Sequence, residues 1–308
     1  MAWLRPGTRR PCGRGQERQQ VQLRLPENGD GKQPRRRRAG AERRLPYSDI
    51  DLSRWRDYAE ISTDSLWIIP SRSREGGHRL DYWGNFVPQI ARQVFQRFSR
   101  QGDVVLDLFL GSGTSALEAM NLGRRLIGVE IDERLAEQVR RKLGPEAASL
   151  GIHVLTGDSS SRRIVRPIRR LLQAEQREFA QLLVLHPPYH DIIRFTPYER
   201  DLSNAPDTAS FLRAFRRVAR IGFELLQPER FAVLVIGDKY EDRELVPLGF
   251  LTMQQMVKAG FRLKSIVVKN IVGNERGKGK ATNLWRYRAL AGGFYIFRHE
   301  YVIIFQKP

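Results

Sequence analysis

Two short segments of this chain place glycine, acidic and other polar residues directly after an apolar stretch. The first, residues 107–114, reads Asp-Leu-Phe-Leu-Gly-Ser-Gly-Thr and continues the apolar residues 104–106. The second, residues 186–189, reads His-Pro-Pro-Tyr and follows the apolar residues 182–185. Ligands of open parallel sheets bind beyond the carboxyl ends of the strands. Both segments are therefore candidates for one binding and reaction site.

The first segment has the features of a cofactor loop. Gly111 and Gly113 allow a tight turn between a strand and the following helix, and they allow the backbone to approach a ligand closely. Glu130 ends the next expected strand, 17 residues after Gly113, where an acid can bind both hydroxyls of a ribose. Asp158 ends the strand after that one. Three acids at successive strand ends predict a site for an adenosyl cofactor.

For S-adenosylmethionine, we expect Asp107 and the glycine loop to contact the methionine portion, Glu130 the ribose and Asp158 the adenine amine. A nicotinamide dinucleotide fits less well, because its motif usually has a third glycine where this chain has Ala116. That variant is tolerated in dinucleotide sites, so the dinucleotide stays open as an alternative.

The second segment suits chemistry on an exocyclic base amine, whose lone pair is delocalised into the ring. Pro187 and Pro188 fix the backbone, so their carbonyls can point rigidly into a pocket. The Pro187 carbonyl and a neutral His186 could accept hydrogen bonds from the amine and raise its reactivity, while Tyr189 stacks on a flipped base. An imidazolium has no free acceptor, so activity should fall at low pH. The alternative is a rigid turn with a packed tyrosine.

Composition narrows the choice of chemistry. The chain has 308 residues, of which 41% are hydrophobic, enough for one sizeable core. The longest apolar runs are strand-sized, so we expect no membrane span. The single cysteine, Cys12, lies in the first residues, which excludes a thiol nucleophile from the folded part, and the histidines have no ligand-like spacing, so we expect no metal. A formal net charge of +19 favours a polyanionic partner.

The basic charge is concentrated at the amino terminus. Residues 1–44 contain 13 lysines and arginines against four acids, and they show neither a helical nor a strand period. We expect a disordered basic tail over 1–44 and a single catalytic domain over 45–308. The domain is basic as well, because about half of the net charge remains there.

Strand and helix patterns alternate through the domain, which predicts an α/β fold with a doubly wound, mostly parallel, seven-stranded sheet. The expected strands are 104–109, 125–131, 152–156, 182–185, 231–236, 263–270 and 294–305. The expected helices are 114–122, 133–143, 161–176, 210–226 and 248–259. No helix is expected between the last two strands, which predicts a C-terminal antiparallel hairpin at the sheet edge.

These motifs resemble those of the amino-group DNA methyltransferases, which methylate cytosine N4 or adenine N6. The resemblance rests on residues 107–114, on the Pro-Pro-aromatic motif at 186–189, on Gly84-Asn85-Phe86-Val87-Pro88-Gln89 and on the closing strand, and it covers about residues 50–308. It implies the Rossmann-like fold of SAM-dependent methyltransferases, S-adenosyl-L-methionine as cofactor, DNA as substrate and a cytoplasmic enzyme. It also leaves a restriction enzyme open as a partner.

The resemblance assigns further residues and one departure. Asn85 and Phe86 would pack beside the cofactor, and Phe109 and Thr114 belong to the cofactor motif. His186 stands where family members have Asp, Asn or Ser, so the target base is left open between cytosine and adenine. Two other readings stay open, which are methylation of an RNA base and a nucleic-acid-binding protein that has lost catalysis.

Two segments are candidates for contacting nucleic acid, namely residues 189–206 and 273–290. The second mixes aromatic side chains with basic ones, a combination that suits phosphates and stacked bases. Its basic residues are Arg276, Lys278, Lys280, Arg286 and Arg288. A solvated hairpin with one buried tryptophan is the equally weighted alternative.

Overall fold

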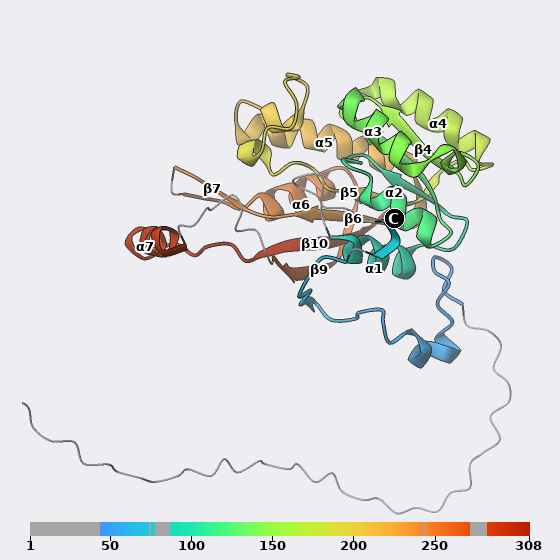
Figure 1. Cartoon of the computed structure of the whole chain (residues 1–308), viewed down its shortest axis with the longest axis horizontal. Coiled ribbons are helices and arrows are strands. Elements are labelled where there is room, and N and C mark those ends of the chain that lie inside the picture. The colour runs from blue at the N-terminus through green and yellow to red at the C-terminus, as the bar shows by residue number, and fades with distance from the viewer. Residues whose placement is uncertain (1–43, 74, 78–86, 243, 272–281) are drawn as a thin grey trace, which may run out of the picture. The chain divides into compact units, whose positions relative to one another are not determined.

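The computed structural model of the chain describes residues 44–73, 75–77, 87–242, 244–271 and 282–308 (Figure 1). The strands are β1 Leu66–Trp67, β2 Val104–Asp107, β3 Arg125–Glu130, β4 Ile152–Thr156, β5 Ala180–Leu185, β6 Leu226–Ile236, β7 Lys239–Glu241, β8 Glu244–Val246, β9 Arg262–Asn270 and β10 His299–Gln306. The α-helices are α1 Pro88–Phe98, α2 Thr114–Asn121, α3 Glu133–Leu143, α4 Val165–Ala174, α5 Thr208–Leu225, α6 Leu248–Lys258 and α7 Thr282–Gly292. Short 3-10 helices are η1 Leu52–Tyr58, η2 Glu75–Gly77, η3 Pro145–Ala147, η4 Arg162–Ile164, η5 His190–Ile192 and η6 Leu202–Asn204.

Eight strands form the main sheet, in the order β1-β9-β10-β6-β5-β2-β3-β4, and β7 and β8 form a separate two-stranded ribbon. β10 is antiparallel to both of its neighbours, and the other pairs of the main sheet are parallel. β2 lies between β3 and β5, so the strand ends that carry the two sequence motifs are neighbours at one edge of the sheet.

Helices cover both faces of this sheet, because its central strands are apolar on both sides. One core layer contains buried side chains of α1, α2 and α3, and the other contains those of α4, α5 and α6. The described residues include no helix of the length and apolar character that a membrane span requires. The predicted doubly wound, mostly parallel sheet with antiparallel strands at its C-terminal end is confirmed.

The structure corrects four details of the predicted fold. The main sheet has eight strands instead of seven, because Leu66 and Trp67 pair in parallel with Val268 and Lys269 of β9. β9 and β10 do not form a simple hairpin, because α7 lies between them. β10 begins only at His299, and α1, which begins with a proline at its first turn, was not predicted.

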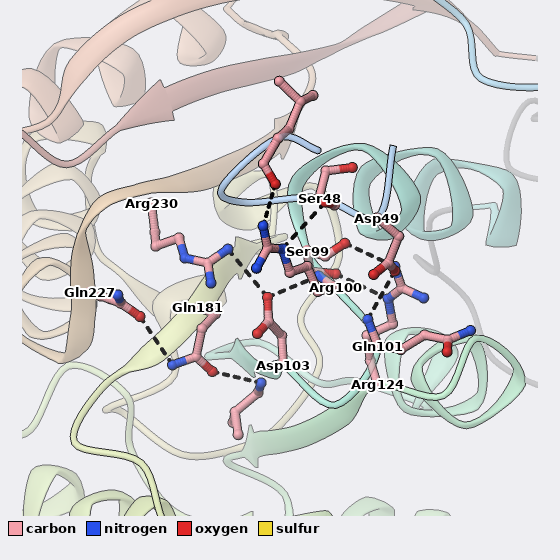
Figure 2. A network of polar contacts seen from close by, with 12 residues as sticks. Ser48, Asp49, Ser99, Arg100, Gln101, Asp103, Arg124, Gln181, Gln227 and Arg230 are labelled. Carbon is pink, nitrogen blue, oxygen red and sulfur yellow. Dashed lines mark hydrogen bonds and ion pairs between the residues drawn. The ribbon is translucent and has the colours of Figure 1, made fainter. Parts of the chain in front are cut away.

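The described chain begins at Arg44, so nearly all of the predicted tail at residues 1–44 lies outside the described residues. The next residues are attached to the amino-terminal edge of the sheet by two arginines (Figure 2). The Arg124 guanidinium is almost fully buried and donates to Asp49 at 2.8 Å. Arg100 donates to the backbone carbonyl of Ser48 at 3.3 Å.

The sheet ends at β4 on the side opposite β1, and Arg140 of α3 lies over this edge. Its guanidinium donates to the Val154 carbonyl at 3.3 Å and to the Thr156 hydroxyl at 2.8 Å. An open groove of about 650 Å³ runs between α3 and β4 beside this arginine. The residues that line the groove come mainly from α3, from β4 and from the segment between them. None of them belongs to the two sequence motifs at 107–114 and 186–189.

Candidate functional site

The glycine loop connects β2 to α2 and depends on two left-handed backbone positions. Gly111 has φ 55° and Gly113 has φ 82°. A Cβ at Gly113 would also lie 2.8 Å from Val139, so both the backbone conformation and the space at this position require glycine. The loop therefore turns sharply at the carboxyl end of β2, and Gly113 lets it pack closely against Val139 of α3.

Glu130 connects the end of β3 to this loop. Its carboxylate accepts hydrogen bonds from the Gly111 amide and the Asp132 amide, both at 2.9 Å. The residue is only 9% exposed, and this burial raises the pKa of Glu130 to about 7. A carboxylate has about four acceptor positions, so Glu130 keeps acceptor capacity for a ligand's hydroxyl groups.

Asp107 lies beneath the loop and is fully buried. Its carboxylate accepts a hydrogen bond from the Phe109 amide at 2.9 Å and another from the Ser115 hydroxyl. Burial raises the pKa of Asp107 to about 6. Asp107 thus ties the two ends of the glycine loop together from inside. Thr114 is buried as the first residue of α2, and Phe109 is half-buried against the core.

The end of β4 meets the same site. The Gly157 amide donates to the Glu130 carbonyl at 2.8 Å, and the Ser159 hydroxyl donates to the Leu108 carbonyl at 2.7 Å. Asp158 lies between these two anchors, is half-buried and accepts a hydrogen bond from the Ser160 amide. The three acids predicted from the sequence therefore stand at three successive strand ends that hydrogen bonds join.

The His-Pro-Pro-Tyr segment follows β5, which pairs with β2 so that Asp107 lies opposite Val184. His186 is half-buried, and burial lowers the pKa of its imidazole to about 4. The His186 ring meets the Tyr189 ring edge to face, with centroids 5.8 Å apart. Pro187 is buried and Pro188 half-buried. A neutral imidazole thus stands one strand away from the glycine loop.

Tyr189 is held from behind by residues that the sequence did not single out. Its hydroxyl donates to Glu300 of β10 at 2.7 Å, and Glu300 accepts from Lys269 of β9 at 2.8 Å. Glu300 and Lys269 are both buried and stand opposite each other across the two strands. The ring also packs on Gly237, where an added Cβ would lie 2.9 Å from it. This chain of contacts fixes the tilt of the Tyr189 ring.

A second buried cluster anchors the segment after Tyr189. His190 has φ 53°, is 1% exposed and hydrogen-bonds through Nε2 to the Ala205 carbonyl at 2.9 Å. Its Nδ1 lies 2.8 Å from Nζ of the buried Lys239, which also contacts Asp191 at 2.7 Å. Because lysine only donates, His190 accepts through Nδ1 and donates through Nε2. The cluster closes residues 190–205 into a loop at the carboxyl edge of the sheet.

Five of the predicted site residues lie outside the described residues, namely Asn85, Phe86, Arg276, Lys278 and Lys280. Arg286 and Arg288 are exposed on α7, and the Arg288 guanidinium lies 5.3 Å from the Trp285 ring centroid. Over the described part of the chain, no three metal-binding side chains gather into a possible metal centre.

The family comparison covers the glycine loop and ends before the His-Pro-Pro-Tyr segment. The family model described as DNA methylase, of the N6 and N4 type, matches residues 19–141. The chain is 40% identical over 68 residues to type II methyltransferase M.MjaI of Methanocaldococcus jannaschii, covering 22% of each chain. It is 31% identical over 74 residues to type II methyltransferase M.BglI of Bacillus subtilis, covering 24% of this chain and 20% of the relative. The matches thus span about a fifth of the relatives' length.

Among solved structures, TrmN from Thermus thermophilus is 17% identical, with a TM-score of 0.43 over 72% of this chain and 49% of that one. A putative DNA modification methylase, also from Thermus thermophilus, is 22% identical, with a TM-score of 0.29 over 42% of this chain and 44% of that one.

Proposed function

We propose that the chain is an amino-group DNA methyltransferase, which methylates the exocyclic amine of a DNA base at cytosine N4 or adenine N6, and its similarity to this family supports the proposal. The methyl donor of this family is S-adenosyl-L-methionine, which is the cofactor of this chain. The observation that carries the proposal is the pairing of β2 with β5, since it sets the glycine loop and His186 at neighbouring strand ends.

The residues present fit the cofactor. Gly111 and Gly113 provide the left-handed backbone that turns the loop, and Glu130 has acceptor capacity left for ribose hydroxyls. Asp158 stands at the neighbouring strand end, and we assign it to the adenine amine. We assign Asp107 to shaping the loop instead of contacting the methionine portion directly, because it is fully buried and its carboxylate binds the Phe109 amide and the Ser115 hydroxyl.

The cofactor supplies an electrophilic methyl group on a positively charged sulfur, and the protein's residues prepare the acceptor amine. Neutral His186 and the Pro187 carbonyl accept hydrogen bonds from the amine, which draws its lone pair out of the ring system. Bound S-adenosyl-L-methionine would supply the methyl group and leave as the neutral thioether S-adenosylhomocysteine, and neutral His186 would take the proton that the methylated nitrogen loses. No covalent intermediate with the protein is needed, unlike methylation at a ring carbon.

Tyr189 supplies one wall of the base site. The hydrogen bond to Glu300 fixes the orientation of the Tyr189 ring, which meets the His186 ring edge to face. A base that stacks on Tyr189 would therefore present its exocyclic amine beside the imidazole. Residues 190–205, closed by the Lys239 cluster, stand next to this wall. Substrate access would thus be from the carboxyl edge of the sheet.

The test is incubation of the purified full chain with methyl-labelled S-adenosyl-L-methionine and, in separate reactions, genomic DNA and total RNA, followed by digestion and mass spectrometry of the nucleosides. We expect N4-methylcytosine or N6-methyladenine from DNA, and the product identifies the base. His186→Leu is the matched control, since it removes the acceptor but keeps a side chain of similar size. Label in RNA alone, or cofactor binding without transfer to either nucleic acid, would refute the proposal.

A further inference from the structure

Nine arginines gather on the solvent side of η4, α4 and α5, on the face of the sheet opposite α1, α2 and α3. We call them the α4–α5 arginine surface. They are Arg162, Arg163, Arg166, Arg169, Arg170, Arg213, Arg216, Arg217 and Arg220. All are exposed except Arg216, which is half-buried.

The helical spacing aligns these side chains. Residues 162, 166, 169 and 170 recur at the three- and four-residue steps of one helix face, and so do residues 213, 217 and 220. The opposite faces of the same helices are buried, with Ile168 and Leu172 on α4 and Phe211 and Phe215 on α5. The guanidinium groups therefore point away from the core, in two rows about 12 Å long at 1.5 Å per residue.

The positive charge of this surface is largely uncompensated. Glu224 pairs with Arg162 and with Arg169, the latter at 2.8 Å. Within the described part of the chain, the other seven arginines form no ion pair with a carboxylate. On the opposite face, by contrast, Arg140 pairs with two glutamates of its own helix.

Like charges three and four residues apart destabilise a helix, by a few tenths of a kcal/mol per pair. The sequence nevertheless repeats them along two neighbouring helices. Such an arrangement is unfavourable in the free protein and becomes favourable when an anion lies across both rows.

The chemistry of the surface points to phosphate groups. Every cation on it is an arginine, whose planar fork of donors matches phosphate oxygens in pairs. The large exposed hydrophobic side chains of the described residues include none from α4 or α5. A surface that binds a membrane would need such side chains for insertion, so the lack of them on these two helices argues against a lipid partner.

The surface is continuous with the candidate site. Arg162 and Arg163 lie four and five residues after Asp158, and α5 begins just after the loop that the Lys239 cluster closes. Glu224 near the end of α5 pairs with both Arg162 and Arg169, so the two rows adjoin where α5 ends beside η4 and α4. We propose that the α4–α5 arginine surface binds the sugar-phosphate backbone of duplex DNA next to the target base, an inference that rests on the proposed function for its choice of nucleic acid.

The test compares two double variants that lose the same charge. Arg217→Gln with Arg220→Gln removes two guanidinium groups from α5, and Arg134→Gln with Arg141→Gln removes two exposed ones from α3 on the opposite face. Fluorescence anisotropy gives the affinity of the full chain for a labelled duplex of about 30 base pairs, long enough to cross both rows, at several salt concentrations. Thermal unfolding checks that both variants are folded.

Each phosphate contact contributes about 0.9 to the slope of log affinity against log salt. We therefore expect the α5 variant to bind the duplex more weakly and with a slope smaller by about 1.8, while the α3 variant keeps the wild-type slope. Equal losses in both variants would mean that overall charge alone attracts DNA, and would overturn the inference. Tighter binding of wild type to phosphatidylserine vesicles or to an RNA hairpin than to the duplex would also overturn it.

Binding is measured without turnover, so this test is separate from the test of activity. A chain that methylates no DNA but shows the α5-specific loss of slope would keep this inference and lose the proposed function. A chain that methylates DNA while the α5 variant binds like wild type would keep the function and lose the inference.

Discussion

The Tyr189 hydroxyl donates a 2.7 Å hydrogen bond to Glu300, which lies 111 positions further along the chain on β10. Glu300 is in turn bound by Lys269 at 2.8 Å, and both charged groups are buried. Burial beside the Glu300 carboxylate raises the pKa of the Tyr189 phenol well above its ordinary value, so the phenol stays protonated and remains a donor. The orientation of a residue in the proposed base site is thus set by two strands from the far end of the sequence.

Replacing Tyr189 by Phe separates the ring from the hydroxyl. We expect the free energy of unfolding in urea to fall by about 1.5–3 kcal/mol, the typical contribution of a hydrogen bond to a charged group. Turnover should fall far less than in Tyr189→Ala, because the ring that would stack on the base remains. Tyr295→Phe is the control, since Tyr295 is 88% exposed and should change neither quantity. Equal activity of the Phe and Ala variants would exclude a stacking role.

Cofactor affinity should rise with pH through about 7, near the raised pKa of Glu130. Ribose hydroxyls donate hydrogen bonds, so they favour the ionised carboxylate, and the affinity for S-adenosyl-L-methionine should be about tenfold higher at pH 8 than at pH 6. Calorimetry of the wild type and of Glu130→Gln gives the comparison. The variant should bind weakly and without this pH dependence, and a wild type that binds equally at both pH values would contradict the ribose assignment.

The Glu130 carboxyl should also affect the stability of the cofactor-free protein. This contribution to stability should fall as the pH rises, whereas cofactor affinity should increase. The pKa of this carboxyl is 4.5 in the unfolded chain and about 7 in the folded one, so the folded state holds the proton more tightly. This contribution to stability is fully present below pH 4.5 and is lost as the pH rises through 7. Urea unfolding of wild type and Glu130→Gln at pH 5 and pH 8 should show a difference between the two proteins that changes in this direction.

His186 should remain a functional acceptor at pH values where an ordinary histidine is protonated. Because burial lowers the pKa of His186 to about 4, turnover at saturating cofactor should be level from pH 8 to about pH 5. His186→Asn keeps an acceptor oxygen and should retain part of the activity, whereas His186→Leu should lose about 100-fold or more in kcat. A decline of wild-type kcat centred near pH 6.5 would show that the imidazole is not shielded in this way.

Arg124 should be important for stability and unimportant for chemistry. Its guanidinium is almost fully buried, pairs with Asp49 and donates to the Ser99 carbonyl at 2.9 Å (Figure 2). Arg124→Met leaves these acceptors without a donor, and we expect a loss of about 3 kcal/mol in the free energy of unfolding. Arg134→Met, at an exposed position of α3, should cost little. The affinity for S-adenosyl-L-methionine of the folded Arg124 variant should equal that of wild type, because the network lies at the opposite edge of the sheet.

The sequence predicted the strand ends that carry the candidate site well, for a local reason. The strands that carry Asp107, Glu130 and His186 are short apolar runs followed by turn-forming residues. Each of these patterns lies within a few positions of the sequence. Glu300 could not be found in this way. Its role depends on the register of β10 against β9, which sets it opposite Lys269, and on the contact with Tyr189 from a third strand.

Helix α7 was missed because the glycine-rich residues before it suggested a hairpin. A signal was present, since Trp285 and Arg288 are three residues apart and their side chains meet on one side of the helix. The arginines of α4 and α5 were likewise read only as parts of two helices. That they adjoin in one surface follows from the crossover that brings both helices to the same face of the sheet, which no local pattern reveals.

The position of Arg140 over β4 affects how copies of this chain meet one another. An uncovered edge strand offers a row of carbonyl and amide groups to which a strand of another molecule can add, the usual start of sheet aggregation. Here the Val154 carbonyl already accepts a hydrogen bond from Arg140, and the charged guanidinium stands where an added strand would run. The Arg140 side chain therefore hinders the addition of a strand from another copy of this protein at the β4 edge of the sheet.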